Sequence, residues 1–144
     1  MNVGQPPDSA SKRRRRRPPP ALGRLMHHCV SDIDSAEHYT WGGACDGWRL
    51  LKEPTLSVIQ ERVPPGAAET PHFHSRARQF FYVISGTATM EFESEVVTFG
   101  VGQGLHVPPN TQHRFVNRSN TDVVFIVISS PTTTGDRINA GGPA

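Results

Sequence analysis

The stretch that decides the fold is "ETPHFHSRARQFFYVISG", residues 69–86. It contains two histidines one residue apart, His72 and His74, and an apolar run that begins after Gln79. Residues i and i+2 of a β-strand point to the same face, so both imidazoles are predicted to project together while Phe73 points away. Two imidazoles on one face suit a shared cation.

Short β-type runs continue on both sides of this stretch. They are rich in Val, Ile, Phe, Tyr and Thr, have the length of strands and are separated by turn residues, which is typical of a sandwich or barrel. The 13 Gly and 13 Pro among 144 residues also favour many turns and an all-β fold. "VVFIVI", residues 123–128, is apolar at successive positions and predicts a strand covered on both faces, although a buried helical turn remains open.

The chain length predicts one folded domain. The composition of the first residues predicts a basic tail before it. Residues 1–22 hold Lys12 and the run from Arg13 to Arg17, which are six of the fifteen basic residues, and almost nothing apolar. We expect this tail to be disordered and solvated, without a specific nucleic-acid partner. Residues 23–54 are interpreted as a lead-in that packs on the barrel or on a second subunit, and residues 55–144 as the barrel.

Further polar residues extend the histidine pair into a candidate metal site. Gln79 begins the next strand-like run, and His113 follows the Pro-Pro-Asn turn of "PPNTQHRFVN", residues 108–117. Three imidazoles and an amide oxygen form a mixed nitrogen and oxygen donor set that suits Zn, Fe, Ni, Cu or Mn. The alternative is that these are ordinary core or surface side chains without a metal.

The spacing of both segments resembles the paired motifs of the cupin superfamily. The first motif, G(X)5HXH(X)4E(X)6G, is matched from Gly66 to Gly86 with Gln79 in the glutamate position. The second, G(X)5PXG(X)2H(X)3N, is matched from Gly102 to Asn117 with Asn110 in a glycine position. The resemblance covers about residues 55–130 and implies a double-stranded β-helix, or jelly-roll barrel.

By this resemblance His72, His74, Gln79 and His113 occupy the positions of the four metal ligands. One divalent ion per chain is implied, with zinc expected first and Fe, Ni, Cu and Mn as alternatives. Gln79 removes one negative charge from the donor set, which leaves more of the ion's field for a substrate oxygen. A neutral amide is also the weaker ligand, so a site without metal stays open. Asn110 is a mild change, since Asn tolerates a positive φ.

The expected activity is redox-neutral Lewis-acid catalysis. Small single-domain cupins with Gln in the acidic position resemble bacterial cyclases of aromatic polyketide biosynthesis, and the apolar strands predict a pocket for an apolar or aromatic small molecule. A dioxygenase that uses Fe, Ni or Cu and a non-catalytic ligand-binding cupin are the alternatives. His106 is the candidate catalytic proton shuttle or additional ligand if its side chain points inward. Its alternative is a strand histidine that contacts a neighbour.

Other residues carry weaker predictions. Arg76, Arg78 and Arg114 lie near the motifs and offer an anion site, Tyr82 is expected to pack, and Cys45 is a weak candidate nucleophile. No apolar run is long enough for a membrane span, and the spacing of the two cysteines favours free thiols in a reducing cytoplasm, although one disulfide stays open. A homodimer is expected.

Overall fold

The computed structural model describes residues 28–141, and the predicted tail at residues 1–22 lies outside them. Residues from Ser31 onward form one compact unit. Its strands are β1 (Glu37–Trp41), β2 (Cys45–Lys52), β3 (Ser57–Val63), β4 (His72–His74), β5 (Arg78–Ser85), β6 (Thr87–Phe92), β7 (Val96–Gly100), β8 (Gly104–Val107), β9 (His113–Val116), β10 (Val123–Ser130) and β11 (Arg137–Asn139). Among the described residues no helix has the length and hydropathy needed to cross a membrane.

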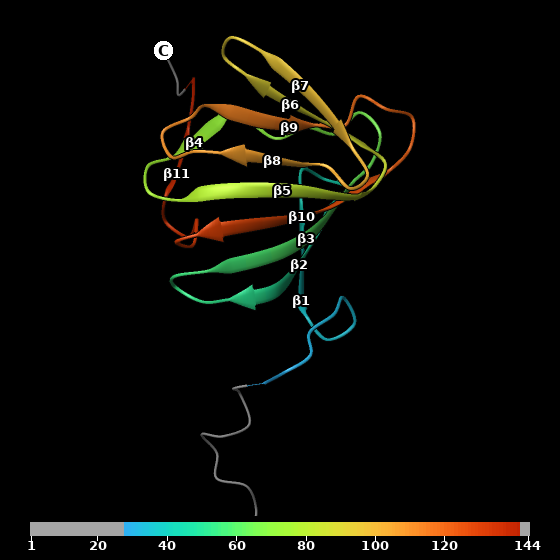
Figure 1. Ribbon diagram of the computed structural model, residues 1–144. Helices are drawn as coiled ribbons and strands as arrows, with labels where there is room; N and C mark the ends of the chain where they lie inside the picture. The colour runs from blue at the N-terminus through green and yellow to red at the C-terminus, as the bar shows by residue number, and fades with distance from the viewer. Residues whose placement is uncertain (1–27, 142–144) are drawn as a thin grey trace, which may run out of the picture. The chain divides into compact units, whose positions relative to one another are not determined.

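The strands form two antiparallel sheets, which confirms the predicted all-β jelly roll (Figure 1). The larger sheet has the order β1-β2-β3-β10-β5-β8 and the smaller one β11-β4-β9-β6-β7. β1 and β2 fall in the segment interpreted as a lead-in, and β2 pairs directly with β3 in the same sheet. Sequence neighbours such as β4 and β5 therefore lie in different sheets, and the loop between them crosses from one layer to the other.

A cluster of three phenylalanines joins the two sheets in the core. Phe115 of β9 stacks on Phe125 of β10 with ring centroids 4.2 Å apart, and Phe81 of β5 lies 5.9 Å from Phe125. Such offset contacts bury large apolar area from both layers. The ring centroid of Phe81 also lies 6.3 Å from that of His113. Phe81 therefore contacts both the apolar core and the histidine cluster.

The outer face of the larger sheet differs from the prediction. β10 was expected to be covered on both faces, but it alternates: Phe125 and Val127 are buried, while Ile128 is 37% exposed. The expectation was wrong because the sheet is antiparallel and only its inner face meets the second layer. Exposed apolar side chains of β5, Phe80, Tyr82 and Ile84, continue this outer face. The homodimer stays a prediction.

Two motif residues other than the histidines, Asn117 and Asn110, link separate segments of the backbone by hydrogen bonds. The fully buried Asn117 donates from Nδ2 to the carbonyl oxygens of Val63 (2.9 Å) and Thr121 (2.8 Å), which ties the end of β3 to the loop before β10. Asn110 has φ 58°, as expected for Asn in the glycine position. Its N–H donates to the carbonyl oxygen of His74 at 2.7 Å and so links the two motifs.

Gly86 gives the first prediction, because it combines a positive φ of 82° with a crowded backbone. A Cβ there would lie 2.4 Å from the carbonyl oxygen of Asp122. Gly86→Ala is expected to lower the free energy of unfolding by about 3 kcal/mol, measured by urea denaturation. Gly66→Ala is the matched control, since Gly66 has φ 80° but open space, and it should lose only about 1 kcal/mol. Equal losses would show that the contact with Asp122 is unimportant.

Candidate metal centre

Three histidines from the smaller sheet meet at the inner face of the barrel. His72 and His74 lie on β4, and His113 of β9 is the cross-strand partner of His72. One ring nitrogen of each lies within 4.8 Å of the other two, and all three side chains are buried. The i, i+2 spacing brings the first two imidazoles to one face, as predicted, and antiparallel pairing supplies the third.

Backbone carbonyls orient two of the rings. The carbonyl oxygen of Thr70 lies 2.8 Å from Nδ1 of His72, and that of Thr111 lies 2.8 Å from Nδ1 of His113. A carbonyl only accepts, so Nδ1 carries the proton in each ring and Nε2 keeps its lone pair. This is the arrangement of metal-binding histidines in general, in which the other ring nitrogen is held by a hydrogen bond.

The histidines are neutral as well as oriented. Burial lowers the pKa of His72 to about 3 and that of His74 to about 4, and it also lowers the pKa of His113. The imidazoles repel one another in their charged forms, which adds to the shift. At neutral pH the cluster therefore presents three unprotonated nitrogen donors.

Gln79 of β5 comes to the same cavity from the opposite sheet. Its side chain is buried, and its Nε2 donates to Oγ of Ser129 at 3.2 Å. This bond fixes the orientation of the amide, and it leaves the buried Oε1 without a hydrogen-bond partner. The predicted ligand positions thus come from three strands: His72 and His74 lie on β4, His113 on β9 of the same sheet and Gln79 on β5 of the other sheet.

The residues present fit a metal ion. Buried polar atoms are normally hydrogen-bonded, and an unpaired one costs about 1–3 kcal/mol. Nδ1 of His74, Oε1 of Gln79 and Nε2 of His113 are all buried without a hydrogen-bond partner. A cation that accepts several of these lone pairs would remove that cost. The set of imidazoles and a carboxamide oxygen suits a borderline divalent ion.

Asp136 holds the loop between His74 and Gln79, and sequence reasoning missed it. The buried carboxylate accepts from the backbone N–H groups of Ser75 (3.1 Å) and Ala77 (2.8 Å) and from Oγ of Ser75 (2.5 Å). Burial opposes ionisation, but hydrogen bonds from Ser75, Ala77 and Arg76 outweigh it and hold the pKa of Asp136 below its usual range. Its position just before β11 offered no local signal, because its partners lie about sixty residues away.

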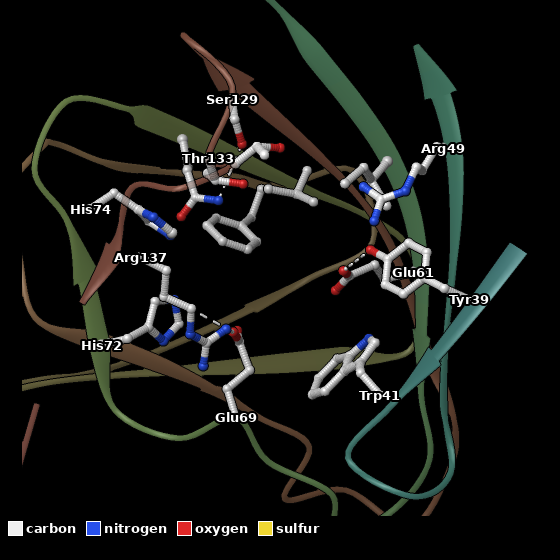
Figure 2. A pocket seen from close by; sticks show the side chains of 15 residues that line it. Tyr39, Trp41, Arg49, Glu61, Glu69, His72, His74, Ser129, Thr133 and Arg137 are labelled. Carbon is white, nitrogen blue, oxygen red and sulfur yellow. Dashed lines mark hydrogen bonds and ion pairs between the residues drawn. The ribbon is translucent and has the colours of Figure 1, made fainter. Parts of the chain in front are cut away.

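His72 and His74 open into a cavity of about 330 Å³ that is more polar than the sequence predicted (Figure 2). Glu69 lies beside the cluster, with Oε2 3.5 Å from Nε2 of His72 and 3.6 Å from a guanidinium nitrogen of Arg137. Burial raises the pKa of Glu69 to about 7, although Arg137 and the N–H of Phe115 oppose the shift. Glu69 lies within the first motif but at one of its unspecified positions, so the motif gave no signal for it.

Glu61 of β3 is a second carboxyl group in the cavity. Oη of Tyr39 donates to it at 3.0 Å. Burial raises the pKa of Glu61 to about 8, and the nearby charge of Glu69 adds to the shift. The cavity therefore holds two carboxyl groups that titrate near neutral pH.

The structure does not bring His106 to the histidine cluster. His106 is exposed on β8 opposite Phe80, whereas its neighbour Val107 is buried. Strand alternation places it on the outer face of the larger sheet. Tyr82 is exposed on the same face, and Cys45 is fully buried with a pKa raised by burial to about 11, which makes a thiolate nucleophile unavailable.

The arginines near the motifs are engaged elsewhere. Arg114 forms an ion pair with Glu91, and Arg76 lies 3.6 Å from Asp136. Arg78 is exposed and lines a shallow depression beside His106, outside the histidine cavity. None of the three lines the cavity, so an anion would meet Arg49 or Arg137 instead.

Comparison with known proteins agrees with this architecture. Residues 59–129, which include both histidine segments, match the family model of the cupin domain. The chain belongs to the cupin superfamily. A solved cupin-like structure, KdgF from Halomonas sp., superposes with a TM-score of 0.66 at 25% identity and covers 72% of this chain and 95% of that one.

Curated relatives match a smaller part of this cupin. It is 28% identical over 67 residues to polyketide synthase CurC of Streptomyces cyaneus, covering 46% of this chain and 44% of CurC. It is 29% identical over 100 residues to a 1-hydroxy-2-naphthoate 1,2-dioxygenase of Nocardioides sp. (strain KP7), covering 67% of this chain and 26% of that enzyme. The chain therefore spans about half, or less, of the length of these relatives.

The raised pKa of Glu61 predicts how stability depends on pH. The folded state keeps its proton up to about pH 8, whereas the ordinary pKa is 4.5, so stability present at low pH is lost as the pH rises through this interval. Glu61→Gln cannot ionise and should raise the melting temperature by several degrees at about pH 9 and change it little at about pH 5.

The matched control for this measurement is Glu53→Gln, since Glu53 is exposed. Its melting temperature should follow that of the parent at both pH values. A Glu61→Gln curve that runs parallel to the parent at every pH would contradict the assignment of Glu61 as a buried, protonated carboxyl group.

Proposed function

We propose that this cupin is a metal-dependent enzyme that catalyses a redox-neutral reaction, of the cyclase type, on an aromatic polyketone. The observation that carries the proposal is the set of buried polar atoms without partners on His74, Gln79 and His113, beside a cavity that Glu61 and Glu69 line. With His72 they would hold one divalent ion, and zinc is our first expectation. A bound ion would polarise a carbonyl oxygen and stabilise the negative charge that develops on it.

Glu69 is the proposed acid and base, in place of the outward-facing His106. Its pKa of about 7 lets the carboxyl group accept and return a proton at neutral pH. In a cyclisation it would take the proton from a carbon next to one carbonyl and return it to the oxygen of a second carbonyl as the new carbon–carbon bond forms. Arg137, 3.6 Å away, keeps Glu69 oriented and partly ionised.

Two likenesses support different versions of the proposal. The similarity to polyketide synthase CurC supports an aromatic polyketone as the substrate class. The similarity to the naphthoate dioxygenase supports the alternative, a dioxygenase that uses Fe, Ni or Cu on an aromatic acid. The neutral donor set with Gln79 favours the Lewis-acid version, since none of the four proposed ligands is a carboxylate. Oxygen consumption separates the two.

Metal retention tests the proposed ligands. His113→Ala should lower the metal content of purified protein from about one ion per chain to nearly none, because it removes one of few nitrogen donors. His106→Ala is the matched control, an exposed histidine outside the cluster, and should keep the metal. Elemental analysis by mass spectrometry measures the metal content of both variants. Full metal occupancy in His113→Ala would contradict the assignment of this cluster as the metal centre.

Turnover tests the chemistry. The reaction on aromatic polyketones should proceed at the same rate without oxygen. Gln79→Glu should keep the metal and lose about tenfold in kcat, since the added charge weakens polarisation of the substrate carbonyl. Gln79→Ala should bind metal more weakly and recover with excess metal. Oxygen uptake that matches product formation would support the dioxygenase, and a fully active Gln79→Glu would show that charge at this position is irrelevant.

A further inference from the structure

Unsatisfied polar atoms in the described residues divide into two groups, one at the histidine cluster and Gln79 and one on the opposite wall of the cavity. Five buried side-chain nitrogen or oxygen atoms lack a hydrogen-bond partner, and three of them belong to His74, Gln79 and His113. The other two are Nε1 of Trp41 and Nε of Arg49, which can only donate. Both side chains line the same cavity, on the wall across from His72 and His74 (Figure 2).

The wall that carries these donors is rigid. The ring of Tyr39 lies directly on Gly47, where a Cβ would come within 2.2 Å of it, so only glycine leaves room for the ring. The guanidinium carbon of Arg49 lies 4.5 Å from the ring centre of Tyr39, a cation–π contact. Oη of Tyr39 donates to Glu61, which completes a chain of contacts from β1 through β2 to β3.

Neither donor is satisfied by the protein itself. Nε of Arg49 lies 3.5 Å from Oε1 of Glu37, but that side chain is 62% exposed and the pair is longer than a normal hydrogen bond. A buried donor without a partner is costly, and this wall holds two of them. Acceptor oxygens of a ligand would satisfy these donors, and the positive charge of Arg49 would strengthen the hydrogen bond that an anionic oxygen accepts from it.

Glu61 does not oppose an anion on this wall at neutral pH. It faces Tyr39 of β1, Arg49 of β2, and Glu69 and Arg137 across the cavity. Burial raises its pKa to about 8, so the carboxyl group is mostly neutral and can itself donate a hydrogen bond. The aromatic side chains of Trp41 and Phe81 also line this cavity.

We propose that Trp41 and Arg49 form a subsite that binds the anionic oxygen, carboxylate or phenolate, of a small aromatic ligand. The ligand would then span the cavity, with its acidic group on this wall and its reacting carbonyl toward the histidines. The identification of this ligand as the substrate rests on the proposed function, whereas anion binding by the wall does not. Trp41 and Arg49 are specificity-determining residues in this arrangement and take no part in proton transfer.

Calorimetric titration with benzoate tests the subsite, with benzamide as the neutral ligand of the same shape. Benzoate should bind the metal-free protein, and benzamide should bind about tenfold more weakly. Trp41→Phe keeps an aromatic ring and removes the donor, and Arg49→Gln removes the charge. Each should weaken benzoate binding about tenfold, and Arg49→Gln should leave benzamide binding nearly unchanged because the neutral amide carries no charge for Arg49 to attract.

Matched controls separate this effect from loss of folding. Trp48→Phe changes the other tryptophan of the chain, whose ring contacts His38 and does not line the cavity, and Arg78→Gln removes an exposed charge. Both should bind benzoate as the parent does. In the Trp48→Phe protein Trp41 is the single tryptophan, so benzoate should also change its fluorescence if it binds beside the indole.

The outcomes distinguish this subsite from the metal centre. Benzoate that binds equally well to the parent, Trp41→Phe and Arg49→Gln overturns the proposal, as does benzoate that binds only after metal is added. Absence of benzoate binding in every form also overturns it. If the protein retains no metal but benzoate binding depends on Trp41 and Arg49, the proposed function fails and the anion subsite stands.

Discussion

The pairing of His72 with His113 across β4 and β9 is the contact on which the site depends. It brings the two rings to a centroid distance of 4.5 Å, and the alternation of β4 adds His74 on the same face. Burial keeps these imidazoles neutral, and hydrogen bonds from Nδ1 to backbone carbonyls hold two of them in place. The smaller sheet therefore supplies donor atoms before any ligand arrives, which reduces the entropy lost when an ion binds.

Loops that connect the two sheets keep this arrangement rigid. Asp136 fixes the turn after His74, and the N–H of Asn110 bonds to the carbonyl oxygen of His74 at 2.7 Å. The larger sheet adds Gln79, whose amide is oriented by Ser129. Each of these contacts joins segments distant in sequence, so the geometry of the site is a property of the closed barrel and not of one hairpin.

The cavity is polarised, with lone pairs on one wall and N–H donors on the other. Carboxyl groups of Glu69 and Glu61 lie on its lining, and burial raises the pKa of both. Leaving polar atoms unsatisfied costs stability, and proteins commonly accept such costs where a ligand binds. A small molecule with a carbonyl at one end and an anionic oxygen at the other complements this distribution, which connects the proposed reaction with the proposed subsite.

The sequence by itself determined the fold family and the candidate ligand positions, because these depend on local spacing: i, i+2 alternation places His72 with His74, and Gly86 and Asn110 stand where the backbone needs a positive φ. Only the tertiary structure decided which other side chains share the cavity. Tyr39, Trp41, Glu61 and Arg137 come from strands whose pairing spans much of the chain, and His106 turned outward because the phase of a strand is set by its partners. These neighbours are set by packing between the two sheets, and a short window of sequence contains no information about that packing.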